Sequence, residues 1–343
     1  MRSTVSRILD RVLDNIQQGW REPNLASVLL YPLSVLYRLV VVLRHAGYRT
    51  GLFRSSKLPV PVIVIGGISV GGSGKTPLVI AMVQFLKEQG YSPGVLSRGY
   101  GGQSDSWPRQ VGKSTTADIV GDEPQLIFER CEVPVVVGPD RVQSGSHLIE
   151  AFGCDVLVSD DGFQHFALRR DLDVVVIDGE FGTANHWCLP AGPLREPVSS
   201  LDRAHVLVVN GNPDRTRLKG KEALAMHVEV RDAKNLATGR VHGLPAFQGA
   251  PVHAVAGVGN PRRFFRALQG AGLTVVNHAF PDHHQYSPED FCFDPVQEIL
   301  MTEKDAVKCR EMKNKEKMWA VPAYLHADPE IFETVCERLA SSG

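Results

Sequence analysis

From residue 58 onward, short apolar runs alternate along the chain with segments that are polar or predicted to be helical, such as residues 78–89. Strands of a parallel sheet are buried on both faces, so they appear as near-continuous apolar runs separated by helices. The pattern therefore predicts an α/β fold with a parallel sheet flanked by helices. The expected strands are residues 61–66, 93–96, 133–137, 155–159, 173–177 and 205–209.

A second, smaller α/β region is predicted to begin after residues 210–217. Its expected strands are residues 226–230, 253–258 and 273–277, and a helix is expected over 262–269. Another helix should open at Ser287, a good N-cap that is followed by proline. We expect domains at 58–215 and 216–343, with the last helix packing back on the first of them. Residues 101–117 read as a long polar loop.

The first 57 residues show a different pattern, typical of amphipathic helices. Apolar residues at positions 5, 8, 9, 12, 13 and 16 fall on one helical face. A second apolar stretch covers residues 25–43 and is long enough to raise the question of a membrane span. Pro32 and Arg38 argue against a span, because a charged side chain at mid-bilayer is costly. Ser27, Tyr31, Ser34 and Arg38 form one polar stripe along this predicted helix.

Charge supports an interfacial position for this N-terminal segment. Residues 1–57 carry nine basic and three acidic side chains. Apolar helices with basic residues lie in membrane interfaces and are attracted to anionic headgroups. We therefore predict helices at a membrane surface over 1–57. The alternative is that they cap the first domain and bury their apolar faces in protein.

Composition places the remainder among ordinary globular proteins. The 343 residues are 43% hydrophobic and 22% charged, with a net charge of −1, and two domains are the default at this length. The near-neutral charge gives no indication of a nucleic-acid partner. Six cysteines without a CxxC pair suggest a reducing compartment, and no secretory signal pattern opens the chain. These features predict a cytoplasmic protein.

A glycine-rich loop after the first predicted strand is the strongest chemical motif. Glycines allow backbone N–H groups to surround phosphates, a lysine meets the β- and γ-phosphates, and a hydroxyl ligates Mg²⁺. A serine occupies the usual place of the first glycine, and the alternative is a structural turn that ends in Gly-Lys-Thr by chance. We predict a nucleotide-binding P-loop made of Ser69, Val70, Gly71, Gly72, Ser73, Gly74, Lys75 and Thr76.

Two adjacent carboxylates, Asp160 and Asp161, follow the predicted strand 155–159. In P-loop enzymes an acidic residue at such a strand end holds the Mg²⁺ that bridges the phosphates. Adjacent carboxylates are also costly unless cations offset them. Asp161 is the first choice as metal ligand, together with Thr76, and Asp160 is the second. The alternative is a solvated turn.

Two further sites are ambiguous from the residues alone. Asp122 lies in a Gly-Asp-Glu-Pro segment, where it is either an acceptor for a hydroxyl proton or a favourable charge at a helix start. His283 and His284 lie on a predicted turn, where histidines usually serve packing or the surface. No further His or Cys lies at zinc spacing, so a structural zinc is not expected.

The sequence resembles the tetraacyldisaccharide 4′-kinases, or lipid A 4′-kinases, of Gram-negative bacteria. The resemblance runs over nearly the whole chain and rests on nine ordered motifs. These are ISVGGSGKTP (68–77), SRGYGG (97–102), VGDEP (120–124), GPDR (138–141), DDGFQH (160–165), LPAGPLREP (189–197), AGVGNPRRFF (256–265), FPDHHQY (280–286) and TEKDAVK (302–308).

The resemblance implies a kinase-like P-loop domain joined to a smaller α/β domain. It implies transfer of the ATP γ-phosphate to the 4′-hydroxyl of a tetraacylated glucosamine disaccharide 1-phosphate, with Mg²⁺. It also implies a peripheral protein on the cytoplasmic face of the inner membrane, and we expect a monomer. The implied catalytic residues are Asp122 as base, His283 as its partner and Lys75 at the phosphates. Arg98, Arg141, Arg195 and Glu196 are the implied secondary site residues.

Two functions from other classes are weighed against this one. A P-loop GTPase switch would carry Asn-Lys-x-Asp after a late strand, and here the expected strand 205–209 is followed by Asn-Gly-Asn-Pro. The similar string at 302–305 has the wrong order. A membrane-bound nucleotide-binding scaffold without transfer chemistry is the second alternative, and a phosphotransfer assay distinguishes it from a kinase.

Overall fold

The computed structural model describes residues 15–213, 218 and 222–342. The chain forms two compact units, each assembled from separate stretches. The first comprises the described parts of 1–73, 161–226 and 328–343, and the second comprises 74–160 and 227–327. The predicted helix over residues 5–16 falls almost wholly outside the described residues. The domain boundaries expected from the sequence stay a prediction.

A parallel sheet is the centre of the first unit. Its strands lie in the order β8-β7-β6-β1, with bounds β1 Val62–Gly66, β6 Leu172–Asp178, β7 Val206–Asn210 and β8 Leu224–Glu229. Every residue of β1, β6 and β7 is buried, as the apolar runs predict for strands covered on both faces. The last helix, α9 (Glu330–Ser342), packs against β7, and the short helix η1 spans Val198–Arg203.

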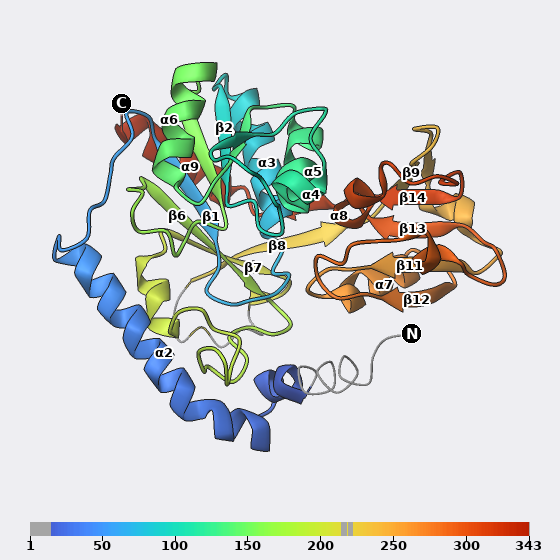
Figure 1. Ribbon diagram of the computed structural model, residues 1–343, viewed down its shortest axis with the longest axis horizontal. Helices are drawn as coiled ribbons and strands as arrows, with labels where there is room; N and C mark the ends of the chain where they lie inside the picture. Colours follow the sequence, from blue (N-terminus) through green and yellow to red (C-terminus); the bar gives the residue numbers. More distant parts are fainter. Residues whose placement is uncertain (1–14, 214–217, 219–221, 343) are drawn as a thin grey trace. The chain divides into compact units, whose positions relative to one another are not determined.

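A long N-terminal helix, α2 (Leu25–Arg49), also belongs to the first unit (Figure 1). Asn24 caps it, because its side chain accepts a hydrogen bond from the Ser27 backbone N–H while the Ser27 hydroxyl accepts one from the Asn24 backbone N–H. The helix continues six residues beyond the predicted end at Leu43. Ser27 and Ser34, one heptad apart, are buried, and most of the large apolar side chains are exposed.

A second parallel group of strands opens the second unit. Its order is β5-β2-β4-β3, with bounds β2 Pro93–Ser97, β3 Arg109–Gln110, β4 Val135–Val137 and β5 Val156–Asp160. Only β3 runs antiparallel to its neighbour. The helices of this part are α3 (Lys75–Glu88), α4 (Ala117–Val120), α5 (Asp122–Cys131) and α6 (Arg141–Phe152).

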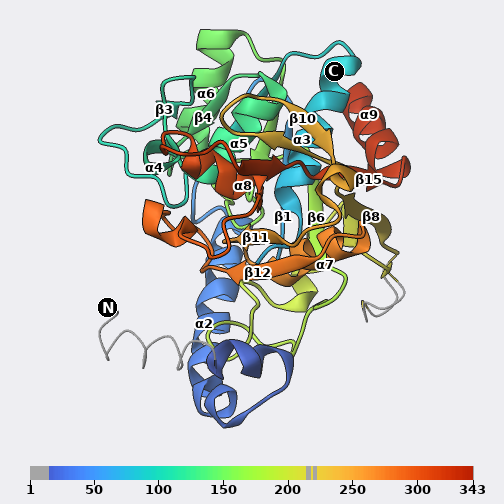
Figure 2. The same cartoon turned by 90° about the vertical axis from the view of Figure 1, so that its right-hand side faces the viewer.

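A six-stranded sheet completes the second unit, in the order β10-β9-β14-β13-β11-β12 (Figures 1 and 2). The strands are β9 Asp232–Asn235, β10 Val241–Gly243, β11 Val252–Ala256, β12 Val275–Ala279, β13 Ile299–Thr302 and β14 Met318–Val321. The shorter elements are η3 Leu244–Phe247, η4 Pro288–Phe291, α8 Glu303–Ala306, η5 Val307–Cys309 and β15 Tyr324–Ala327.

Side-chain alternation divides the core of this sheet between its two faces. Ala254, Ala256 and Leu300 contribute to one buried cluster, which also contains Phe264 and Leu268 of α7 (Pro261–Gly270). Neighbouring strand residues such as Val255 and Met301 belong to a second cluster on the other side. This period of two is what a sheet packed on both faces requires.

The strand expected over 226–230 in the second region is β8, and this assignment was wrong because β8 pairs in parallel with β7 in the first unit's sheet. The other predicted strands and helices agree with the structure apart from two local differences. The helix expected at Ser287 is a single 3₁₀ turn, η4, although Ser287 caps it as predicted. The polar loop over 101–117 contains the two-residue strand β3 and reaches the first residue of α4. Both differences concern short elements in polar segments, where the apolar periodicity carries little information.

Candidate active site

The carboxyl ends of β2, β4 and β5 bring several predicted site residues to one edge of the second unit's first sheet. Leu96 lies beside Ser159 and Ser97 beside Val137 in the parallel registers. Arg98 therefore follows β2 at the same edge where β5 ends in Asp160, and it is exposed. Arg141 begins α6 after β4. Ligands bind at this edge in open α/β sheets.

The glycine loop ends where α3 begins. Gly71 and Gly74 adopt positive φ angles of 106° and 94°, which favour glycine, and Gly74 is the N-cap of α3 without a side-chain cap. Lys75 and Thr76 form the first turn of the helix, where backbone N–H groups attract anions. Because α3 packs against β5, these two residues and Asp160 belong to neighbouring elements of one unit.

The earlier residues of the loop are fastened within the first unit. The Val70 N–H donates to the Pro193 carbonyl at 2.9 Å, and the backbones of Ser69 and Leu194 form an isolated antiparallel β-bridge. Asn210, the last residue of β7, donates its side-chain N–H to the Ser73 carbonyl at 3.0 Å. The glycine loop is thus held by the LPAGPLREP segment and by the end of a buried strand.

Arg141 is 2% exposed and holds the end of β5. Its Nη1 donates to the Ser159 hydroxyl at 2.7 Å and to the Asp160 carbonyl at 2.9 Å. The Asp160 side chain is 1% exposed. This places a guanidinium charge beside a buried strand end that carries a carboxylate.

Asp161, Arg195 and Glu196 lie together in the first unit. Arg195 Nη1 contacts Asp161 Oδ2 at 2.7 Å. Glu196 is buried and accepts hydrogen bonds from Arg203 at 2.6 Å and from Gln164 at 3.1 Å. The secondary residues predicted in the PLREP segment are therefore joined to the DDGFQH segment.

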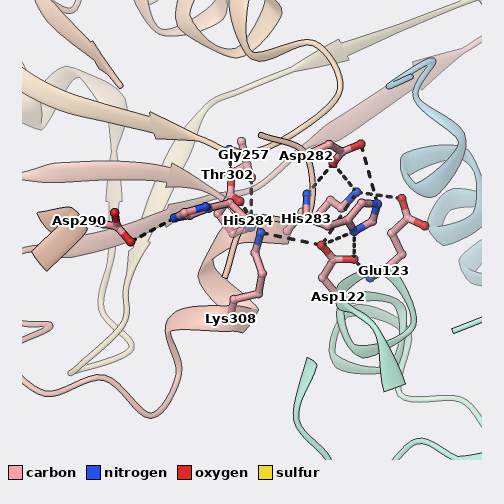
Figure 3. Close-up of polar contacts among 11 residues, drawn as sticks. Asp122, Glu123, Gly257, Asp282, His283, His284, Asp290, Thr302 and Lys308 are labelled. Carbon is pink, nitrogen blue, oxygen red and sulfur yellow. Dashed lines mark hydrogen bonds and ion pairs between the residues drawn. The ribbon is translucent and has the colours of Figure 1, made fainter. Parts of the chain in front are cut away.

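Asp122 and His283 meet within the second unit, although 161 residues separate them (Figure 3). The Nδ1 atom of His283 lies 3.0 Å from both Oδ1 and Oδ2 of Asp122. A carboxylate only accepts hydrogen bonds, so Nδ1 carries the hydrogen. Asp122 is the first residue of α5 and is 4% exposed. His283 adopts a φ of 59°, a strained conformation for a residue with a side chain.

The surroundings lower the pKa of Asp122 and raise the pKa of His283. Burial by itself would raise the pKa of Asp122, but the hydrogen bond from His283 and the ammonium groups of Lys304 and Lys308 outweigh it and lower that pKa. Burial likewise opposes the charged form of His283, but the hydrogen bond to Asp122 raises its pKa above the ordinary value. An anionic aspartate beside a readily protonated histidine is the result.

Sequence reasoning gave no role to Lys304 and Lys308. Lys304 Nζ lies 4.0 Å from Asp122 Oδ2, and Lys308 Nζ lies 3.9 Å from the same oxygen. Both belong to the TEKDAVK segment, where their spacing of four places them on one side of a helical turn. That spacing is the signal that could have pointed to them.

Comparisons with known proteins agree with the motifs. The model of the family described as tetraacyldisaccharide-1-P 4′-kinase matches residues 26–340. A tetraacyldisaccharide 4′-kinase of Nitrosococcus oceani is 46% identical over 90% of this chain and 89% of its own length. That of Methylobacillus flagellatus is 43% identical over 94% of this chain and 95% of its own.

The chain belongs to the tetraacyldisaccharide-1-P 4′-kinase family. It is accordingly a kinase of lipid A synthesis, and the predicted recognition, fold class and enzyme class are confirmed. The crystal structure of an LpxK from Aquifex aeolicus, described as a complex with ATP, is 30% identical. It covers 91% of this chain and 99% of its own, with a TM-score of 0.75. The roles of individual residues stay predictions.

Proposed function

We propose that this chain transfers the γ-phosphoryl group of ATP to the 4′-hydroxyl of a tetraacylated glucosamine disaccharide 1-phosphate, with Asp122 and His283 receiving the hydroxyl proton. The observation that carries the proposal is the 3.0 Å contact of His283 Nδ1 with the Asp122 carboxylate. Family membership supports the substrate class, and the ATP complex of the Aquifex aeolicus relative supports the nucleotide.

In the proposed reaction the sugar oxygen forms a bond to the γ-phosphorus while the bond from that phosphorus to the bridging oxygen breaks, and ADP leaves. The hydroxyl proton passes to the Asp122–His283 pair. Because a hydrogen bond couples the two groups, their proton belongs to the pair rather than to either residue. Asp122 is the predicted acceptor, and the raised pKa of His283 makes the imidazole a suitable holder of positive charge.

The nucleotide end of the site uses the glycine loop. The backbone of residues 69–74 and the first turn of α3 would surround the phosphates, and Lys75 would neutralise charge on the transferring group. Thr76, Asp160 and Asp161 offer hydroxyl and carboxylate oxygens, the donor type that Mg²⁺ prefers. When bound, Mg²⁺ would neutralise charge on the phosphate oxygens. Among the described residues no three His, Cys, Asp or Glu side chains form a metal cage, so this ion would also need oxygens from the nucleotide.

The four secondary residues receive supporting roles. Arg141 holds the backbone of Asp160, and Arg195 holds the carboxylate of Asp161. Glu196 orders the Gln164 amide and Arg203. The exposed Arg98 is free to contact an anionic group on a substrate, because it follows β2 at the ligand edge of the sheet.

We further propose that α2 rests in the membrane interface. Ser34 donates to the Cys188 carbonyl and accepts from the Ala191 N–H, and Tyr37 donates to the Arg195 carbonyl at 3.1 Å. The buried part of the predicted polar stripe thus faces protein, while Arg38 is exposed. The apolar side of α2 is the exposed one, which favours the membrane interface over the alternative in which this helix buries that side in protein. The exposed large apolar residues of α2 are Leu25, Val28, Leu29, Tyr31, Leu33, Val35, Leu36, Leu39, Val40, Val42 and Leu43.

These contacts of α2 with the protein favour a helix attached to the membrane surface over a helix that spans the membrane. By length and composition alone α2 could cross a bilayer, and only 11% of its most apolar 18 residues are buried. A helix whose Ser34 and Tyr37 side chains are hydrogen-bonded to the segment 188–195 cannot be surrounded by lipid on all sides. An acceptor with four acyl chains resides in a membrane, so we propose a monomer on the cytoplasmic face of the inner membrane.

A phosphotransfer assay tests the proposed function. Protein is incubated with γ-labelled ATP and tetraacyldisaccharide 1-phosphate in mixed micelles, and the label in the lipid is measured. Wild-type protein should label the lipid, and Lys75→Ala should not. Lys87→Met removes an exposed cation from the other end of α3 and should retain activity. Unlabelled lipid with wild-type protein, or full labelling with Lys75→Ala, would contradict the proposal.

A further inference from the structure

Two lysines of the TEKDAVK segment face the carboxylate that is proposed to receive the proton. Lys304 belongs to α8 and Lys308 to η5, and their ammonium nitrogens lie 4.0 and 3.9 Å from Asp122 Oδ2. The Glu123 N–H donates to the other oxygen, Oδ1, at 2.9 Å. The two cations thus approach one edge of the carboxylate, and a backbone N–H holds the opposite oxygen.

Lys308 is fixed in place by Asp305 and is hidden from solvent. Its Nζ donates to Asp305 Oδ1 at 2.8 Å, and the two side chains are 2% and 0% exposed. Asp305 in turn accepts from the Gly257 N–H at 2.9 Å and from the Thr302 hydroxyl at 2.6 Å. The Lys308 ammonium also lies 4.9 Å from the centre of the Tyr286 ring. Figure 3 shows the Lys308 ammonium joined by a dashed line to the Asp122 carboxylate.

Lys304 has a different set of partners. Its Nζ contacts Glu123 and Asp282 at 3.1 Å each, in addition to Asp122. Three carboxylates raise the pKa of its ammonium despite burial. Lys304 is therefore shared among several acids at the rim of the cluster. Among the ion pairs of the described residues, Lys308 takes part only in those with Asp305 and Asp122.

We propose that Lys308 is a positioning residue for phosphoryl transfer: anchored by Asp305, its buried ammonium keeps the Asp122 carboxylate ionised and aligned with His283. This inference rests on the proposed function. Buried charges act strongly on one another because little solvent screens them, so a cation at 3.9 Å changes proton affinity measurably.

The competing explanation is that Lys308 only stabilises the fold. A second ion pair of the chain, Arg130 with Glu303, serves as a control that distinguishes this explanation from a positioning role. Arg130 Nη1 contacts both carboxylate oxygens of Glu303, at 2.7 and 2.8 Å. This pair also joins α5 to the TEKDAVK segment and is largely buried, but the structure shows no contact between Arg130 and Asp122 among the described interactions. Its removal therefore reports what loss of an inter-element ion pair does by itself.

The test compares Lys308→Met/Asp305→Asn with Arg130→Met/Glu303→Gln. Each double variant removes both charges of a pair, so neither Asp305 nor Glu303 is left as a buried carboxylate without its cation. We measure kcat, KM for ATP and the pH dependence of kcat in the lipid phosphorylation assay. For the Lys308 variant we expect kcat to fall about tenfold or more and KM for ATP to change less than twofold. The acidic limb of the pH profile should move up by about one pH unit.

The direction of the pH shift follows from the charges that face the pair. These are Glu123 on α5, Asp282 beside His283, and Lys304 and Lys308 on the TEKDAVK segment with Asp305 behind them. The uncharged Tyr100 ring also faces His283, tilted by 54° with the ring centres 4.9 Å apart. Removing the nearest fully buried cation makes proton binding by Asp122 and His283 easier. The pair then becomes protonated, and inactive as acceptor, at a higher pH.

A second measurement needs no catalysis. The His283 titration is followed by NMR in nucleotide-free protein with labelled histidine, assigned by comparison with His283→Gln. Its pKa should be higher in the Lys308 variant than in wild type and unchanged in the Arg130 variant. An unchanged or lower His283 pKa, an unmoved pH limb, or an equal loss of kcat in both variants would overturn the inference. Failure of the proposed function would instead appear as wild-type protein that does not label the lipid.

Discussion

A single N–H of His283 is shared between the two carboxylate oxygens of Asp122, at 3.0 Å from each. The symmetry of this contact means that replacing one oxygen by an amide nitrogen must disturb it, because an amide NH₂ is a donor. Asp122→Asn is therefore a sharper test of the pair than truncation to alanine, which would also leave a cavity.

We expect Asp122→Asn to lower kcat by about 10²- to 10⁴-fold, the usual contribution of general acid–base groups. KM for ATP should change little, because the glycine loop lies on other elements. Steady-state kinetics with both substrates measure the two constants separately. Asp118→Asn, four residues earlier and exposed, is the control and should behave as wild type. A normal kcat for Asp122→Asn would remove this residue from the mechanism.

The stabilising effect of the Asp122–His283 contact should depend on pH. His283 has a raised pKa, so its contribution is fully present below the unfolded value of about 6.5 and is lost as pH rises through the folded value. Asp122 has a lowered pKa, so its contribution is present above its unfolded value and is lost as pH falls through the folded one.

Urea unfolding of wild type and His283→Gln at several pH values measures this effect. The difference in unfolding free energy should be largest near pH 5–6, between the two unfolded values, and smaller at pH 9. A difference that is constant across this range would show that the histidine contributes packing alone.

Gly121 is required by the backbone that delivers Asp122 to the start of α5. Its φ is 92°, and an added Cβ would lie 2.7 Å from the Tyr100 carbonyl oxygen. Gly121→Ala should lower the free energy of unfolding by about 1–3 kcal/mol, as is usual for strained backbone positions. It should also lower kcat by displacing Asp122. The control is Gly112→Ala, where an added Cβ has no neighbour within 4 Å.

The exposed face of α2 should determine membrane binding. Leu36, Val40 and Leu43 share one face of the helix and are each more than half exposed. Replacing Leu36 and Leu43 by Glu should abolish flotation with anionic vesicles, since charged side chains are costly in the hydrocarbon region. Val296→Glu places a charge at an even more exposed apolar site outside α2 and should float normally. Flotation of both proteins alike would contradict the proposed role of α2.

Much of the fold was predictable because buried parallel strands leave a direct trace in the sequence. The runs around Ile63, Val158 and Val175 are all buried strands in the structure. The contact of Asp122 with His283 was less accessible, because no local pattern joins residues 161 positions apart, and only the resemblance paired them. That pairing stays a functional prediction even though the two side chains meet.

Two features of the candidate site could not be predicted for physical reasons. The stripe from Ser27 to Arg38 shows that α2 has a polar side, but a helix pattern does not say which side meets protein when the other side could meet lipid. The spacing of Lys304 and Lys308 indicates that they share one side of a helical turn. It does not indicate that Lys308 is buried against two carboxylates, because lysines usually lie on the surface.

The hydrogen bonds that Ser34 and Tyr37 of α2 donate to the rest of the protein also limit how far this kinase can be truncated. Removing the chain up to Arg49 would take away the exposed apolar face of α2 and favour a water-soluble enzyme. It would also strip the Cys188 and Arg195 carbonyls of the hydroxyl donors Ser34 and Tyr37 that now satisfy them. The stretch that they anchor carries the guanidinium on Asp161 and braces the glycine loop. A more soluble enzyme obtained in this way would therefore hold Asp161 and the glycine loop less firmly.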